Sequence, residues 1–533
     1  MRQRRSGAAA VAVLLAAASL TACTMGGGDD DDDETSSTTD SAGIPDAALA
    51  VMNEERYANS RWQIYVEDLE SGDVLVDYFG DAMAEPGSFV KTYSAGAAWL
   101  EFGADSTLTT PVKASGEIVD GVLEGDLILV GQGDLTMGGR TKPDGTVSIT
   151  DLDHNDANPL PGATLTPEDP LTGLNDLATQ VKASGIDSVS GDVIVDDRLF
   201  TGELAGQPVT PININQNIID ILITPGAAEG DPATGELIPA VAPWTLTVDV
   251  ETVEAGGTTA LDDPVDTGDG RLTVTGTIAA DADPTLKVYV FDDPATFART
   301  AFIEALDRAG VTVTADPIAA NPDAALPTED EVAQLPAVAE LESLPLSEEV
   351  TYVMKISYNR GAQTLICRLA VVGGSKDCDD GMAVAGEIWQ DAGLDTTGAA
   401  LIDGSGLPGN FITAKNAAQV QRIMAERPDA DLWLDTLPIM GVDGSLTTVQ
   451  ADSDAAGKVF AKTGTLAAFD AFNTRFRIVT KTLGGVIEAE SGRTLLFTVI
   501  MNNAFASPED YIDAVFQAND DVGAIAAAIQ QEY

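Results

Sequence analysis

Histidine is almost absent from this sequence, which holds one, His154, in a polar loop, and only three cysteines. A catalytic triad that depends on histidine, or a metal site rich in histidine, is therefore not expected. Basic residues are scarce as well, because 28 lysines and arginines stand against 85 acidic residues, giving a net charge of −57. Such a surface repels nucleic acids and anionic lipids. We expect no nucleic-acid partner, no metal and no organic cofactor.

Long apolar runs are missing too. The apolar stretch at residues 8–20 follows three arginines and is too short to span a membrane, since a spanning helix needs about 20 apolar residues. It ends in Leu20-Thr21-Ala22-Cys23, which resembles the bacterial lipobox. We predict a lipoprotein signal peptide over 1–22 and a lipid on Cys23. An ordinary signal peptide with an incidental cysteine is the alternative.

Residues 23–43 contain glycines, five consecutive aspartates and a run of serine and threonine, with almost nothing apolar to bury. This composition is typical of a disordered, extended tether. We therefore expect an exported protein that touches the membrane only through its N-terminal lipid. It would act on the outer face of the bacterial cytoplasmic membrane, within the cell wall.

The two remaining cysteines, Cys367 and Cys378, lie close together in the sequence. An exported chain folds in a compartment that permits disulfides. We predict a disulfide between them that closes a small loop, and the alternative is a pair of buried thiols.

The chain beyond residue 44 is long enough for several domains. Both of its ends mix helical and strand patterns, whereas the middle consists mainly of short strands with Gly, Asp and Pro turns up to about Asp283. This arrangement predicts one α/β domain interrupted by a large insertion. The patterns predict strands within 61–78, 459–463, 474–479 and 494–501, and helices over 88–103, 294–309, 354–372 and 508–528.

Three short motifs occur once each and in this order: Ser88-Phe89-Val90-Lys91, Ser357-Tyr358-Asn359 and Lys462-Thr463-Gly464. A lone Ser-x-x-Lys is expected about once by chance in a chain of this length, so it means little by itself. The ordered set is typical of serine enzymes that react with penicillin. Lysine is rare here, which makes each lysine-containing motif more informative.

The spacing of the first motif has a chemical reason. Residues i and i+3 share one face of a helix, so the amine of Lys91 should lie beside the hydroxyl of Ser88. A serine becomes a nucleophile when a base takes its proton, and a lysine can be that base if its pKa is lowered. Burial and a second cation, for which Lys462 is the candidate, lower a lysine pKa. A solvated helix lysine is the alternative.

The other motifs supply the remaining roles. Ser357 can relay a proton to the leaving amine, and Asn359 can orient the peptide, although either side chain could instead cap the next helix. On the third motif, Lys462, Thr463 and Thr465 can bind a carboxylate.

A glycine in the third motif, Gly464, permits close approach of the substrate backbone. The backbone N–H groups of Ser88 and Thr465 are the expected donors to the oxyanion.

Together these motifs resemble the D-alanyl-D-alanine carboxypeptidase/endopeptidase family, the class C low-molecular-mass penicillin-binding proteins (peptidase family S13). Further segments resemble that family: 125–134, 191–200, 215–226, 401–407, 441–446 and 491–494. Two departures are Tyr358, where the family often has aspartate, and Leu135, where proline is usual after Gly133-Asp134. The resemblance also suggests Asp196 as a contact for the stem-peptide side chain.

The resemblance implies a β-lactamase/transpeptidase-like α/β domain, an antiparallel sheet with helices, interrupted by two nested and mostly β inserted domains. The 268 residues between Ser88 and Ser357 leave room for them. The expected boundaries are 44–113 and 325–533 for the catalytic domain, 114–200 and 286–324 for inserted domain II, and 201–285 for inserted domain III.

The predicted function is a serine-type DD-peptidase that cuts D-alanyl bonds of peptidoglycan stem peptides through an acyl-enzyme on Ser88, with β-lactams as covalent inhibitors. A β-lactamase shares the motifs but does not need the large insertion. A non-catalytic, wall-binding scaffold lipoprotein with the same fold is the alternative from another class. A solute-binding lipoprotein would account for the tether but not for the ordered motifs.

Overall fold

A five-stranded antiparallel sheet forms the centre of the part of the molecule that is built from both ends of the described chain. The structure is a computed structural model that describes residues 43–268 and 270–533. The sheet has the order β2-β1-β23-β22-β21, so the first strands of the chain pair with the last ones. Its strands are β1 (Arg61–Asp68), β2 (Val74–Tyr78), β21 (Val459–Asp470), β22 (Arg475–Glu488) and β23 (Thr494–Ala506).

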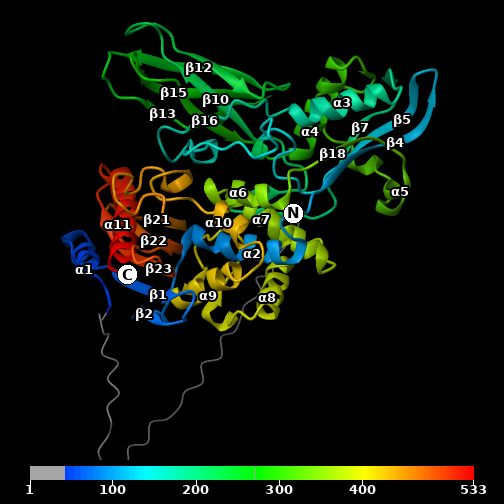
Figure 1. Ribbon diagram of the computed structural model, residues 1–533. Coiled ribbons are helices and arrows are strands. Elements are labelled where there is room, and N and C mark those ends of the chain that lie inside the picture. The colour runs from blue at the N-terminus through cyan, green and yellow to red at the C-terminus, as the bar shows by residue number, and fades with distance from the viewer. Residues whose placement is uncertain (1–42, 269) are drawn as a thin grey trace, which may run out of the picture. The chain divides into compact units, whose positions relative to one another are not determined.

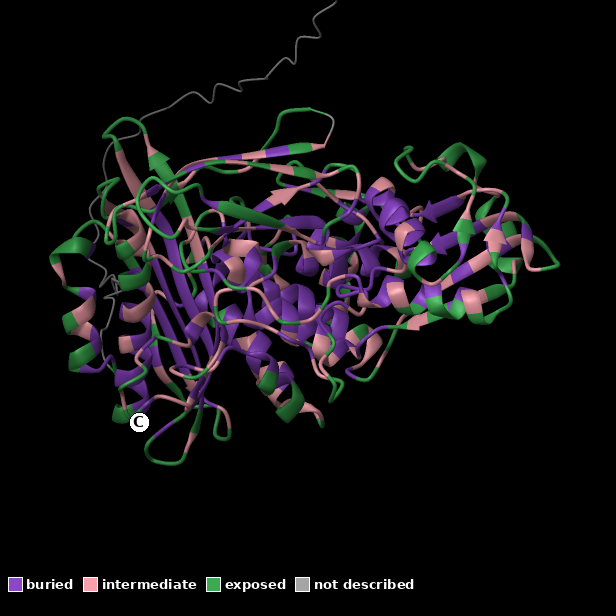
Figure 2. Cartoon of the chain, turned by 90° about the horizontal axis from the view of Figure 1, so that it is seen from above, coloured by how far each residue is buried: buried purple, intermediate pink, exposed green. Residues whose placement is uncertain are grey.

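Alternate side chains of β23 enter two different cores. Phe497 and Val499 pack in one core with α1 (Asp46–Met52) and α11 (Tyr511–Glu532). Leu496 and Ile500 point to the other core, because successive side chains of a strand face opposite sides. The helices of that second core are α2 (Lys91–Phe102), α6 (Leu346–Lys355), α7 (Asn359–Val372), α8 (Gly381–Asp391), α9 (Ala414–Ala425) and α10 (Ala430–Thr436). The sheet is thus a mostly buried layer between helices (Figure 2).

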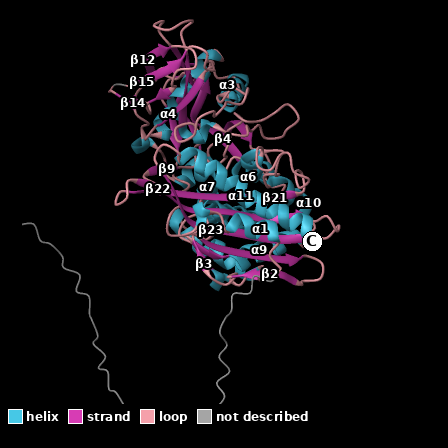
Figure 3. Ribbon diagram, turned by 90° about the vertical axis from the view of Figure 1, so that its left-hand side faces the viewer, coloured by secondary structure: helices cyan, strands magenta, loops and turns pink. Residues whose placement is uncertain are grey.

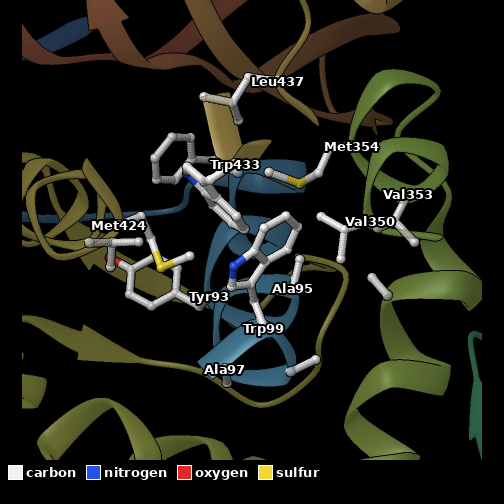
Figure 4. Packing of buried hydrophobic residues seen from close by; sticks show 14 of the residues in the cluster. Tyr93, Ala95, Ala97, Trp99, Val350, Val353, Met354, Met424, Trp433 and Leu437 are labelled. Carbon is white, nitrogen blue, oxygen red and sulfur yellow. The ribbon is translucent and has the colours of Figure 1, made fainter. Parts of the chain in front are cut away.

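Helix α2 is held by aromatic packing along its length. Trp99 meets Trp433 of α10 edge to face, with ring centroids 5.5 Å apart, and its indole N–H donates to Asp429 at 2.9 Å. Tyr93 donates to Asn416 at 2.9 Å. Figure 4 shows Trp99 and Trp433 beside Met354 of α6, and Tyr93 beside Met424 of α9. Because such packing leaves little freedom, it fixes the start of α2 at Lys91 and the turn before it, which holds Ser88.

A second group of strands surrounds α3 (Thr172–Ala183) and α4 (Pro294–Arg308), and a third group forms a separate pair of small sheets. In Figures 1 and 3 the strands β12 and β15 lie apart from β1 and β2. The second group comprises β4 (Thr109–Val119), β5 (Val122–Val130), β6 (Ser188–Val189), β7 (Val193–Asp196), β17 (Thr312–Val313) and β18 (Ala337–Glu342). The third comprises β10 (Ile218–Thr224), β11 (Thr234–Ile238), β12 (Thr245–Val253), β13 (Ala260–Leu261), β14 (Val265–Asp266), β15 (Arg271–Ala279) and β16 (Thr285–Val290).

The region up to Asp283 consists mainly of strands and also holds α3, which buries Leu174, Leu177 and Val181 on one face. One expectation about local structure needs correction. The helix expected over 354–372 is two helices, α6 and α7, separated by a break at 356–358. The antiparallel sheet with helices agrees with the predicted fold class. The predicted domain boundaries stay a prediction.

Candidate active site

The lysine of the first motif lies at the start of α2, directly after a 3-10 turn over Gly87–Val90. Lys91 is completely buried, and its Nζ lies 2.8 Å from Ser88 Oγ. The same Nζ lies 2.6 Å from Asn359 Oδ1 and 3.0 Å from the carbonyl oxygen of Ser405. A neutral amine can donate its two hydrogens to Asn359 Oδ1 and to the carbonyl oxygen of Ser405. Its lone pair of electrons then faces the hydroxyl of Ser88.

Burial lowers the pKa of Lys91 to about 7, although Asp403 and Asp156 nearby favour its charged form. We expected Lys462 to contribute to this shift. In the structure the repulsion between the two ammonium groups lowers mainly the pKa of Lys462. Burial and then the charge of Lys91 hold this pKa well below its usual value. At neutral pH a substantial fraction of Lys91 is therefore the free base that Ser88 requires.

The middle motif stands at the break between α6 and α7. Ser357 has a φ of 59°, a left-handed conformation that ends α6 and is uncommon for a serine. Its hydroxyl accepts a hydrogen bond from Lys462 Nζ at 2.9 Å. Asn359 is the first residue of α7, and neither side chain caps that helix. Tyr358 is buried and does not line the cavity in front of Ser88.

The third motif runs along β21, close to the turn that carries the serine. A Cβ on Gly464 would lie 1.9 Å from the carbonyl oxygen of Pro86, so only glycine fits there. A Cβ on Gly87 would lie 2.7 Å from the backbone nitrogen of Thr465. This close approach brings Gly87, the residue before Ser88, against the backbone nitrogen of Thr465, consistent with the expected pair of oxyanion donors.

In front of Ser88 is a cavity of about 530 Å³. Thr463 and Thr465 line it, and Ser445 lies beside them with its Oγ 3.0 Å from Thr463 Oγ1. Lys481 of β22 also lines the cavity and donates to Thr465 Oγ1 at 2.7 Å. Sequence analysis missed Lys481, and the available signal was a lysine, rare in this chain, between two threonines and flanked by the apolar residues Val479 and Leu483.

A wall of the same cavity comes from residues 151–160, a segment that showed only polarity in the sequence. Its histidine, His154, is 1% exposed, although its sequence neighbours are polar. Its ring nitrogens lie 2.9 Å from Asp220 and 2.8 Å from Arg140, and Arg140 forms a two-pronged ion pair with Asp153. This buried network holds the segment against the sheet strand β10.

Other predicted residues lie elsewhere. Cys367 and Cys378 form a disulfide between α7 and the turn before α8. Asp196 is paired with Arg198 at 2.7 Å and does not line the cavity, so it is not placed to contact a ligand there. Cys23 lies outside the described residues. No helix in the described ranges is long and apolar enough to cross a membrane.

An antiparallel sheet between helical layers, with a buried lysine beside a serine at the start of a helix, defines a serine peptidase of the penicillin-binding class. The chain belongs to the D-Ala-D-Ala carboxypeptidase 3 (S13) family, whose model matches residues 47–521. It is thus a serine DD-peptidase, a carboxypeptidase-type hydrolase of the cell wall that acts outside the cytoplasm. The non-catalytic scaffold is not favoured.

Relatives and solved structures agree with this assignment. The chain is 29% identical over 479 residues to the D-alanyl-D-alanine carboxypeptidase of Actinomadura sp. (strain R39), covering 84% of this chain and 78% of that protein. The crystal structure of penicillin-binding protein 4 from Haemophilus influenzae has the same fold, with a TM-score of 0.65, 20% identity and coverage of 89% of this chain and 98% of that one. The same protein has also been solved with a β-lactam bound (TM-score 0.62, 21% identity, covering 89% and 98%).

Proposed function

We propose that Ser88 is the nucleophile of this peptidase and that Lys91 is its general base. The observation that carries the proposal is the position of Lys91 Nζ, fully buried and 2.8 Å from Ser88 Oγ. Asn359 and the Ser405 carbonyl take up the two hydrogens of the neutral amine. They act as positioning groups that aim its lone pair at the hydroxyl.

The reaction proceeds in two halves. Ser88 Oγ attacks the carbonyl carbon of the D-alanyl bond while its proton moves to Lys91, and the backbone N–H groups of Ser88 and Thr465 stabilise the oxyanion. The C–N bond then breaks. Because the Ser357 hydroxyl accepts from Lys462, its own proton is free for the leaving amine, and it is replenished from Lys91. One water then hydrolyses the ester and restores Ser88.

The substrate proposed is a stem peptide of peptidoglycan, with the leaving residue over β21. Its carboxylate would lie against Thr463 and Thr465, which line the cavity beside Ser88. A β-lactam presents a reactive amide and a nearby carboxylate, so the same groups would accept it. With its leaving group still tethered, such an adduct should hydrolyse slowly.

Labelling with a fluorescent penicillin tests this assignment. We expect wild type to gain the mass of one penicillin on the tryptic peptide that contains Ser88, and Ser88→Ala to gain none. Ser94→Ala is a matched control, because Ser94 lies on α2, directly after the turn that holds Ser88, and donates to Gly404 O at 2.7 Å without lining the cavity. An adduct on a different serine, or none on folded wild type, would refute the proposal.

We also propose how the protein is held at the cell surface. We infer from the sequence Leu20-Thr21-Ala22-Cys23 that a lipid on Cys23 anchors the mature protein. In Triton X-114 phase separation of producing cells, we expect wild type in the detergent phase and Cys23→Ser in the aqueous phase. Equal partition of the two forms, with a mature N-terminus other than residue 23, would instead indicate an ordinary signal peptide.

A further inference from the structure

A third buried lysine in the active site has no counter-charge. Lys481 is 4% exposed and lies on β22 directly across from Thr465 of β21. In the described ranges, its ammonium group has one hydrogen-bond partner, the neutral Thr465 hydroxyl, and no carboxylate within ion-pairing distance. A buried ammonium without an anion is unfavourable. Its pKa is accordingly lowered to about 7 by burial.

The surroundings make this charge more costly still. Lys462 and Lys91 lie in the same site, and both Lys91 and Lys481 lower the pKa of Lys462. Asp156 is near enough to Lys91 and Lys462 to favour their charged forms, but it is not among the groups that affect Lys481. The positive charge at the Thr465 end of the cavity is thus left for a ligand to balance.

The hydrogen bond from Lys481 also orients the hydroxyl of Thr465 toward the cavity. A hydroxyl has one proton to donate. Because Thr465 Oγ1 accepts from Lys481 at 2.7 Å, its proton is free for an acceptor in the cavity. Thr463 is set up in a similar way, with Ser445 Oγ 3.0 Å away. Two hydroxyls and an ammonium group then face one place, a combination suited to a carboxylate.

We propose that Lys481 is a specificity-determining residue that, with Thr463 and Thr465, selects substrates whose leaving residue carries a free carboxylate. The inference rests on the proposed function, because it assigns the leaving residue to the β21 side of Ser88. A carboxamide in the same place would leave the ammonium unbalanced. Selection against amidated leaving residues is the consequence.

Steady-state kinetics on two matched peptides test this role. We would use diacetyl-Lys-D-Ala-D-Ala with a free C-terminal carboxylate and the same peptide as its C-terminal amide, following release of D-alanine or D-alaninamide. Wild type should prefer the acid. Lys481→Met should lower kcat/KM for the acid roughly 10- to 100-fold, mainly through KM, since a charge-assisted hydrogen bond is lost. The value of kcat/KM for the amide should change by less than about 2-fold. Lys481→Arg should restore most of the preference for the acid over the amide.

Lys458→Met is the matched control, because Lys458 directly precedes β21, the strand that pairs with the Lys481 strand β22, without lining the cavity. It should leave both peptides unaffected. Equal losses on acid and amide in Lys481→Met would show a merely structural role and overturn the inference, as would an unchanged preference for the acid.

A binding measurement separates this inference from the proposed function. Calorimetry on Ser88→Ala, which cannot turn over, should show weaker binding of the acid peptide when Lys481→Met is added and unchanged binding of the amide. A failure of Ser88 chemistry would appear as the missing penicillin adduct. A failure of the carboxylate selection would appear as the same acid-to-amide affinity ratio with and without Lys481.

Discussion

Replacing Lys91 by methionine is expected to slow the acylation of Ser88 by a β-lactam roughly 1,000-fold, the usual contribution of a general base. Methionine fills a similar volume and is tolerated in a buried place, so the loss should reflect the missing amine. Stopped-flow or quench measurement of adduct formation at saturating β-lactam gives the rate constant directly. Thermal unfolding of the variant should remain close to that of wild type, because removing a buried lysine also removes the cost of burying its charge.

The pH dependence of the same rate constant identifies the base. The active form of Lys91 is neutral, and its pKa is lowered to about 7 by burial. The acylation rate of wild type should therefore rise as the pH increases through about 7 and level off above it. Lys481→Met should keep this rise, because it alters binding of the carboxylate rather than the base. A flat profile between about pH 5.5 and 8.5 in wild type would exclude Lys91 as the base.

Residues that act through local spacing could be predicted from the sequence. Ser88 and Lys91 are three positions apart, and Lys462 follows a short apolar run, so motif and periodicity together placed them on the start of a helix and on a strand. The prediction of one helix over 354–372 was wrong at the position of the Ser357 motif. Ser357 adopts a φ of 59° there and separates α6 from α7, a backbone choice that side-chain periodicity does not reveal.

Residues that act through long-range pairing could not be predicted in the same way. Lys481 reaches Thr465 because β21 and β22 pair in one register, and a shift by one residue would place it on the other face. His154 was placed only in a polar loop, because its sequence neighbours are polar. Its partner Asp220 lies 66 residues away, so the network exists only after the intervening chain has folded.

Replacing Arg140 by methionine is expected to destabilise the fold by about 3–5 kcal/mol, the usual result of removing one member of a buried ion pair. The Arg140 side chain is 7% exposed, that of Asp153 is fully buried, and both guanidinium nitrogens contact the carboxylate at 2.8 Å. Methionine would leave that carboxylate buried with its charge unpaired. Urea unfolding followed by tryptophan fluorescence would measure the loss, and penicillin labelling would show whether the wall at 151–160 still supports acylation.

The pH dependence of this loss has a definite sign. Burial alone would raise the pKa of Asp153, but Arg140 outweighs it and holds that pKa below its usual value. In wild type the pair therefore stabilises the protein above about pH 4 and loses this contribution as the pH falls through the pKa of the folded state. Without Arg140 the pKa should rise, so the variant's deficit should be largest at neutral pH and shrink on acidification.

The double variant Arg140→Met/Asp153→Asn separates the unpaired charge from the loss of packing. Asp153 accepts from the backbone N–H groups of His154 and Thr150 on separate oxygens. Asparagine carries no charge and keeps one of these two acceptors. We expect the double variant to be more stable than Arg140→Met alone, because removing both members of a buried pair costs less than removing one. If the double variant is instead the less stable, the contacts of Arg140 with Tyr352 and His154 matter more than the ion pair for holding the wall of the active site.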